Sequence, residues 1–141
     1  MFERMMAMAV LPAADLDRAQ AFWRDVFGFE PAHVDEGGAI YELGGVPVLV
    51  YESSFAGTAG STAMSLVTDD LDRDMTALRT HGLVFLDYDF PGLQTVDGVA
   101  DFGDGRSAWF TDSEGNIVAL TQPSPQLQSL ARKAMAAASN G

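Results

Sequence analysis

The sequence predicts an α+β fold in which two similar βαβββ modules share one core. Two internal repeats carry this prediction. The tetrapeptide Asp-Leu-Asp-Arg at residues 15–18 returns at 70–73, and the segment 45–50 is echoed by 115–120, where a glycine again leads into a mostly apolar run. A repeat of this length does not usually bury its apolar face alone. We therefore expect two modules packed against each other.

Length and composition limit the chain to one compact domain. Its 141 residues are 48% hydrophobic, which is enough apolar material for a core. We place the domain at residues 1–122, with module one at 1–53 and module two at 62–122. The Gly- and Ser-rich stretch between them is typical of a flexible linker. Residues 123–141 form a separate helical tail.

Module one begins with a short apolar run at residues 5–11, which we interpret as a buried strand ending at Pro12. Asp15 is a good helix N-cap, and Gly28 supplies the left-handed stop. Between them the apolar residues recur at helical spacing: Leu16, Ala19, Trp23, Val26 and Phe27. Three further strands are predicted, separated by glycine turns, at 30–34, 39–43 and 47–51.

Module two repeats this pattern. A strand at 63–68 leads to a helix capped by Asp70 or Asp69 and stopped at Gly82. Further strands are predicted at 83–88, 107–111 and 117–122, with a long loop at 91–104 that contains a short strand at 99–102. In the tail, Ser124 caps a last helix, whose narrow apolar stripe should dock on a neighbour: Leu127, Leu130, Ala131, Ala134 and Met135.

Charge and composition exclude several classes of function. The formal net charge of −12 repels phosphate backbones and anionic lipid, so neither nucleic acid nor a membrane surface is expected as a partner. The chain has no Cys, hence no disulfide and no thiolate chemistry. No apolar run is long enough to span a membrane, and the start lacks the pattern of a secretory signal. We expect a cytoplasmic protein.

Two βαβββ modules and a closing segment at 109–116, Trp-Phe-Thr-Asp-Ser-Glu-Gly-Asn, together resemble the vicinal-oxygen-chelate superfamily. This superfamily includes glyoxalase I, extradiol dioxygenases, and the fosfomycin- and bleomycin-resistance proteins. The resemblance covers about residues 5–122 and implies that the two modules form a curved mixed sheet around a cleft. It does not imply one chemistry, because the superfamily hosts many reactions.

In the metal-dependent members, the first and last strands of each half supply the ligands. We locate the corresponding four ligand positions in this sequence by their spacing from the two Asp caps and the closing turn. They are occupied by Met8, Leu49, Ala63 and Ala119. Sites for Zn²⁺, Fe²⁺ or Mn²⁺ need imidazole and carboxylate groups. The chain has only two histidines: His81 suits a helix end, and His33 suits an exposed strand. We therefore expect no metal and no other cofactor.

Strand alternation adds neighbours to these positions on the cleft face. The predicted ligand-binding set is apolar and aromatic with a few hydroxyls, and no catalytic residue can be assigned: Met8, Leu49, Tyr51, Ala63, Ser65, Trp109, Ala119 and Thr121. The side chain of Trp109 is expected to line the cleft, whereas that of Trp23 belongs to the inner face of the first helix.

Three functions remain open. The first is a metal-free protein, similar to the bleomycin-resistance proteins, that sequesters a neutral or cationic, apolar or aromatic small molecule as a homodimer. The second is a glyoxalase-like lyase or dioxygenase-type enzyme that works without the usual metal, through Tyr51, Thr121, a nearby Asp or a cofactor carried by the substrate. The third is an interaction protein whose cleft is closed by core side chains.

Overall fold

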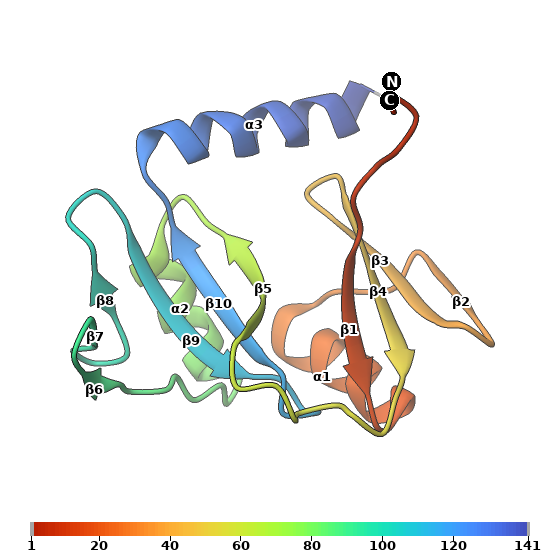
Figure 1. The fold of residues 1–141 in the computed structure, drawn as a ribbon, viewed down its shortest axis with the longest axis horizontal. Helices are drawn as coiled ribbons and strands as arrows, with labels where there is room; N and C mark the ends of the chain where they lie inside the picture. The colour runs from red at the N-terminus through yellow and green to blue at the C-terminus, as the bar shows by residue number, and fades with distance from the viewer. Residues whose placement is uncertain (1, 141) are drawn as a thin grey trace.

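The protein folds into two four-stranded sheets, each backed by one helix, with a third helix across the top (Figure 1). The computed structural model describes residues 2–140, with side chains for residues 2–137. The first sheet has the strand order β1-β4-β3-β2 and the second has the order β5-β10-β9-β8. Strands β6 and β7 form a separate two-stranded sheet. This is the predicted α+β architecture of paired modules.

The elements follow the predicted order except between residues 83 and 94. Module one contains β1 (Ala9–Ala13), α1 (Leu16–Phe27), β2 (His33–Asp35), β3 (Gly38–Leu43) and β4 (Val46–Glu52). Module two contains β5 (Thr62–Val67), α2 (Leu71–Thr80), β6 (Asp89–Phe90), β7 (Leu93–Gln94), β8 (Ala100–Asp101), β9 (Arg106–Thr111) and β10 (Ile117–Gln122). The tail forms α3 (Pro125–Asn140). In each module the first strand lies parallel to the last strand of its module, β1 to β4 and β5 to β10.

The predicted N-caps of the first two helices are confirmed, whereas the C-cap of α2 is His81, one residue before the predicted stop at Gly82. The Asp15 carboxylate accepts a hydrogen bond from the backbone N–H of Arg18, and Asp70 accepts one from that of Arg73. Each bond satisfies an amide that the first helical turn leaves without a partner. Gly28 ends α1 in the left-handed conformation, with φ of 74°.

The strand predicted at residues 5–11 is shifted along the chain. The observed β1 runs from Ala9 to Ala13 and therefore contains Pro12, which we expected to end it. The reason is the position of β1 at the edge of its sheet, where it pairs only with β4. A proline is tolerated on an edge strand because its missing N–H can face away from the ladder.

The strand predicted at residues 83–88 is not formed. Leu83 and Phe85 are buried, as the alternation of apolar residues indicates. They pack against the core, but the segment forms no ladder of hydrogen bonds with a neighbouring strand. Within residues 2–140, a single backbone hydrogen bond ties this segment to the sheet, from the Leu86 N–H to the Trp109 carbonyl at 2.8 Å. This bond places the segment beside β9.

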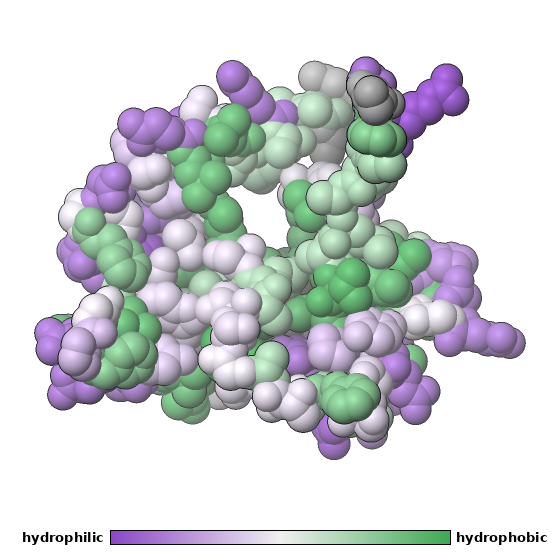
Figure 2. Space-filling model, viewed as in Figure 1, coloured by the Kyte–Doolittle hydropathy of each residue, from purple (hydrophilic) through white to green (hydrophobic). Residues whose placement is uncertain are grey.

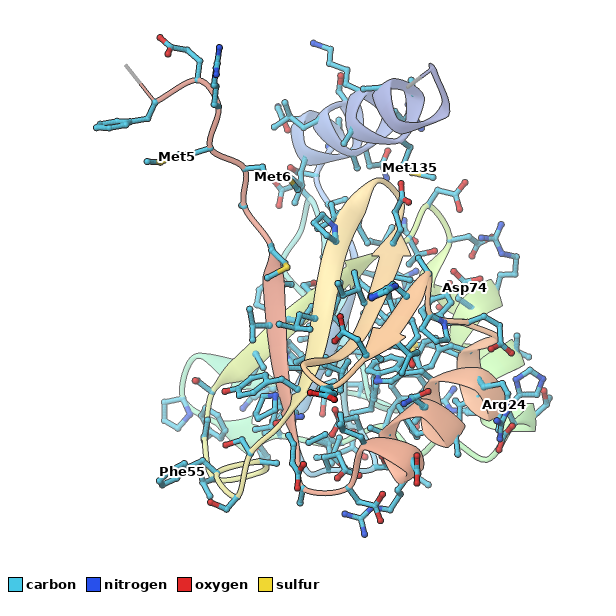
Figure 3. The ribbon with its side chains drawn as sticks, turned by 90° about the vertical axis from the view of Figure 1, so that its right-hand side faces the viewer. Met5, Met6, Arg24, Phe55, Asp74 and Met135 are labelled. Carbon is cyan, nitrogen blue, oxygen red and sulfur yellow. The ribbon has the colours of Figure 1, made fainter. Side chains whose placement is uncertain are left out.

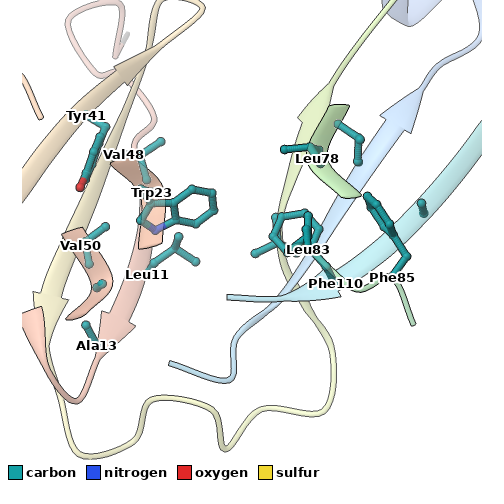
Figure 4. Packing of buried hydrophobic residues seen from close by; sticks show 14 of the residues in the cluster. Leu11, Ala13, Trp23, Tyr41, Val48, Val50, Leu78, Leu83, Phe85 and Phe110 are labelled. Atoms are coloured by element: carbon teal, nitrogen blue, oxygen red, sulfur yellow. The ribbon is translucent and has the colours of Figure 1, made fainter. Parts of the chain in front are cut away.

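The two modules share one aromatic core, as the repeats predicted. Phe110 of β9 is fully buried, and its ring centroid lies 6.4 Å from both Phe22 and Trp23 and 5.4 Å from Phe27. Those three rings belong to α1 of the other module. Phe85 closes the cluster from the module-two side at 6.1 Å (Figure 4).

The turn between β9 and β10 locks the modules together. Glu114 accepts hydrogen bonds from the Asp15 N–H and from Arg18 Nε, both at 2.8 Å, so it holds the start of α1. The Asn116 amide donates to the Pro12 carbonyl at 2.8 Å. Arg18 holds the pKa of Glu114 at about 2, well below its usual value, whereas burial raises the pKa of Asp112 in the same turn.

Helix α3 crosses above both sheets (Figure 1). Its larger apolar side chains, Leu127, Leu130 and Met135, are exposed, and Ala131 is half-buried. The apolar stripe that we expected to dock is therefore mostly uncovered in the single chain. Within residues 2–140, no helix combines the length and apolar character needed to cross a membrane.

Candidate ligand-binding site

Five of the eight expected site residues form one patch on the second sheet. We call Ala63, Ser65, Trp109, Ala119 and Thr121 the β10 patch. In the sheet register, Ala119 lies opposite Trp109 on one side and Ser65 on the other. The intervening residues Val118 and Leu120 point to the opposite face and are buried in the core. The alternation of β10 thus separates a core face from a patch face.

The other three residues lie on the first sheet. Leu49 and Tyr51 are half-buried on the face of β4 opposite to the buried Val48 and Val50. Val10 of β1 lies opposite Leu49 in the register and is 45% exposed. Met8 directly precedes β1 and is also 45% exposed, and the chain before it leaves the body as an arm that carries Met5 and Met6 (Figure 3).

The single chain does not join these two groups into one ladder. Across residues 2–140, no strand pairing connects the first sheet to the second. A groove of about 920 Å³ does lie between the modules beneath α3, where Figure 2 shows an opening bordered mainly by hydrophobic residues. Among the eight expected site residues, only Ser65 lines this groove.

Three hydroxyl groups cross the β10 patch as a hydrogen-bonded row. Thr121 Oγ1 lies 2.9 Å from Ser65 Oγ and 3.0 Å from Ser107 Oγ. We call Ser65, Thr121 and Ser107 the hydroxyl row. Sequence reasoning missed Ser107, although a signal was present: it precedes Trp109 by two residues on β9 and so shares its face.

An aromatic wall borders the patch. The ring of Trp109 meets the ring of Tyr88 edge-on, with centroids 5.7 Å apart and an interplanar angle of 85°. Tyr88 in turn meets Phe90 at 5.8 Å and 76°. Tyr88 was missed because it ends the segment that was predicted as an ordinary strand, and Phe90 was missed because it lies just beyond that segment, in β6. Ala119 is only 5% exposed and forms the floor between Trp109 and Ser65.

The residues present do not fit a metal ion. Ala63 and Ala119 carry no donor atom, and no group of three or more His, Asp or Glu side chains in the described part of the chain could hold a metal. His33 is exposed and bound to Asp35, at 2.9 Å. The ring of His81 donates from Nδ1 to the Val26 carbonyl at 2.7 Å and so links the ends of the two helices. Neither histidine belongs to the patch.

Solved structures of other proteins share this fold. UcmS2 is 16% identical, and the match covers 83% of this chain and 98% of that chain with a TM-score of 0.64. A glyoxalase/bleomycin resistance protein from Catenulispora acidiphila is 21% identical, with coverage of 84% and 97% and a TM-score of 0.63. The fosfomycin resistance protein FosX from Listeria monocytogenes is 17% identical, with coverage of 86% and 95% and a TM-score of 0.61.

No family model matches the sequence, and the curated proteins likewise give no match. The structural neighbours nevertheless share the fold: two open βαβββ sheets in one chain, which is the fold of the vicinal-oxygen-chelate superfamily. The resemblance inferred from the repeats and the closing turn is confirmed at the level of the fold. Many neighbours are metal-dependent enzymes, so the fold alone does not decide the function.

Proposed function

We propose that this protein binds a small apolar or aromatic molecule, neutral or cationic, on the β10 patch without a metal ion, and that it sequesters that molecule. The observation that carries the proposal is the chemistry of the patch. Methyl groups stand at Ala63 and Ala119, where the resemblance places the ligands of the metal-dependent members, and Ala119 lies between the indole of Trp109 and the hydroxyl of Ser65 in the register. A mostly apolar surface with a few convergent polar groups is the usual small-molecule site.

Sequestration is favoured over turnover by the same residues. The patch contains no Asp, Glu, His, Lys or Arg that could act as a general acid or base within it. Its hydroxyls are bonded to one another and not to a base that would make one of them a nucleophile. Turnover of any bound probe would instead favour the enzyme, with Tyr51 or Thr121 as the groups to test.

We further propose that the functional unit is a homodimer. The open sheet faces expose apolar side chains that a second copy would cover, among them Met8 and Val10 at 45% and Val67 at 46%. Homodimers commonly pair the same surface of both subunits about a two-fold axis. Such pairing would set module one of one copy against module two of the other and would bring Leu49 and Tyr51 toward the partner's patch.

Tryptophan fluorescence tests the proposed binding, because the two indoles lie in different places. Trp23 is 3% exposed in the core, whereas Trp109 belongs to the β10 patch. We expect neutral and cationic naphthalene derivatives to quench the wild-type protein and the Trp23→Phe variant, but not the Trp109→Phe variant. If no derivative binds above background, the patch is closed by its own side chains and the proposed function is wrong.

A further inference from the structure

The hydroxyl row has an unused proton. Three hydroxyl groups bring three O–H donors, and the two bonds among them consume two donors. Among the residues that the structure describes, these three oxygens make no other hydrogen bond. One O–H must therefore point out of the row, whichever way the row is oriented.

Burial decides which hydroxyl carries that proton. Ser107 is only 7% exposed, Thr121 is half-buried, and Ser65 is exposed. An unsatisfied donor costs most where water cannot reach it. The favoured orientation thus has Ser107 donating to Thr121 and Thr121 donating to Ser65, which leaves the Ser65 O–H free at the open end. Each bond in such a chain strengthens the next one.

The register places this donor opposite the indole. Ser65 and Trp109 lie on the two strands that flank β10, with Ala119 between them. Because neighbouring strands are about 4.8 Å apart, the two backbones are about 10 Å apart. Ala119 fills little of that width. A flat molecule can therefore contact Trp109 at one end and reach the Ser65 hydroxyl with the other.

From these observations we propose that the hydroxyl row selects a neutral ligand whose aromatic part carries a hydrogen-bond acceptor, such as an aryl ketone or an aryl amide, held by the Ser65 O–H. Ammonium groups have no lone pair to accept this bond. Carboxylates could accept it, but no cationic side chain belongs to the patch, and the chain as a whole carries a net charge of −12. The inference rests on the proposed function and narrows the ligand class.

Matched probes test the inference. 2-Acetylnaphthalene offers a carbonyl, and 2-isopropenylnaphthalene has the same shape without an acceptor. By calorimetry, we expect the wild-type protein to bind the ketone about tenfold more tightly, the scale of one net hydrogen bond. Ser65→Ala should remove this preference by weakening the ketone alone, and Ser65→Thr, which keeps the hydroxyl, should restore it. Ser129→Ala on the exposed side of α3 is the matched control.

The hydroxyl row also predicts an effect of Thr121 on the ketone preference. Thr121→Val removes the middle hydroxyl and should lower the ketone preference, even though Ser65 itself is unchanged. If the wild-type protein binds both probes equally, or if Ser65→Ala keeps the preference, the inference is overturned while the proposed function stands. If neither probe binds, the proposed function fails and the inference fails with it.

Discussion

The two tryptophans show how one residue type serves two purposes. Trp23 is packed among the rings of α1 and Phe110, whereas Trp109 lies at the border of the patch. We predict that Trp109→Ala weakens binding of an aromatic ligand by about 1–3 kcal/mol, the size of a lost aromatic contact with its buried area.

The same substitution at Trp23, in the core, should reduce stability and not ligand binding. Trp23→Ala leaves a large cavity and should lower the free energy of unfolding by about 3–5 kcal/mol. Urea unfolding and calorimetric titration of both variants measure the two effects separately. A Trp109→Ala variant that is as destabilised as Trp23→Ala would show that Trp109 is a core residue.

Glu114 makes the stability of the protein depend on acid pH. Its pKa in the folded state is about 2, against an ordinary value of 4.5, because Arg18 and the Asp15 N–H bind the carboxylate. A lowered folded pKa stabilises the folded state at pH values above 4.5, and this contribution is lost as the pH falls toward 2. Asp112 has the opposite effect on the pH dependence of stability. Burial raises its pKa, so protonation of this carboxyl favours the folded protein.

We therefore predict that Glu114→Gln lowers the free energy of unfolding at pH 7 by about 2 kcal/mol, the scale of a lost charged hydrogen bond. The difference from wild type should shrink as the pH falls from 4.5 to 2. Urea unfolding across this range measures it, with the exposed Glu42→Gln as the control. A difference between Glu114→Gln and wild type that does not change with pH would contradict the assigned ion pair.

At the scale of elements, local chemistry explains what the sequence could predict. The N-caps Asp15 and Asp70 and the stop at Gly28 depend on neighbouring residues alone, so both helices were located closely. Whether a segment forms a strand depends on the other strands with which it pairs. The position of Pro12 on an edge strand and the lack of a ladder at 83–88 are set by contacts far along the chain, which hydrophobic alternation does not report.

The linker offers a direct test of the contact between modules. Gly57 has a φ of +76°, and a Cβ added there would lie 2.6 Å from the Glu114 carbonyl oxygen. We predict that Gly57→Ala lowers the free energy of unfolding by about 2–4 kcal/mol, because both the backbone conformation and the close approach favour glycine.

Gly60 provides the matched control, since a Cβ there would meet nothing within 4 Å. Gly60→Ala should change stability by less than about 0.5 kcal/mol. Thermal and urea unfolding of the pair measure the difference. Equal stabilities for the two variants would mean that the linker does not pack against the closing turn.

For the molecule as a whole, the site was only partly predictable. Spacing from the repeats named Ala63, Ala119 and Trp109, and the register places Ala119 beside Trp109, whereas Ala63 lies at a register shift between β5 and β10. Ser107 could have been found from its spacing to Trp109. Tyr88 could not, because the segment that carries it reaches the patch through a single bond to β9 and not through a strand pairing.

The whole molecule is expected to pair with a second copy. We expect light scattering at micromolar concentration to give the mass of a dimer, because the open sheet faces are apolar. Val10→Glu, on the open face of β1, should shift the equilibrium toward monomer. Val84→Glu, at a position that is 77% exposed in module two, should not. A monomer mass for the wild-type protein at high micromolar concentration would contradict the proposed dimer.

We propose that the β10 patch binds its ligand without a metal ion. The most direct measurement is a calorimetric titration of 2-acetylnaphthalene into protein dialysed against EDTA, repeated after addition of Mn²⁺. Because Ala63 and Ala119 offer no donor atoms, we predict the same affinity in both titrations and no rise in melting temperature with Mn²⁺. Binding that appears only after Mn²⁺ is added would contradict the account.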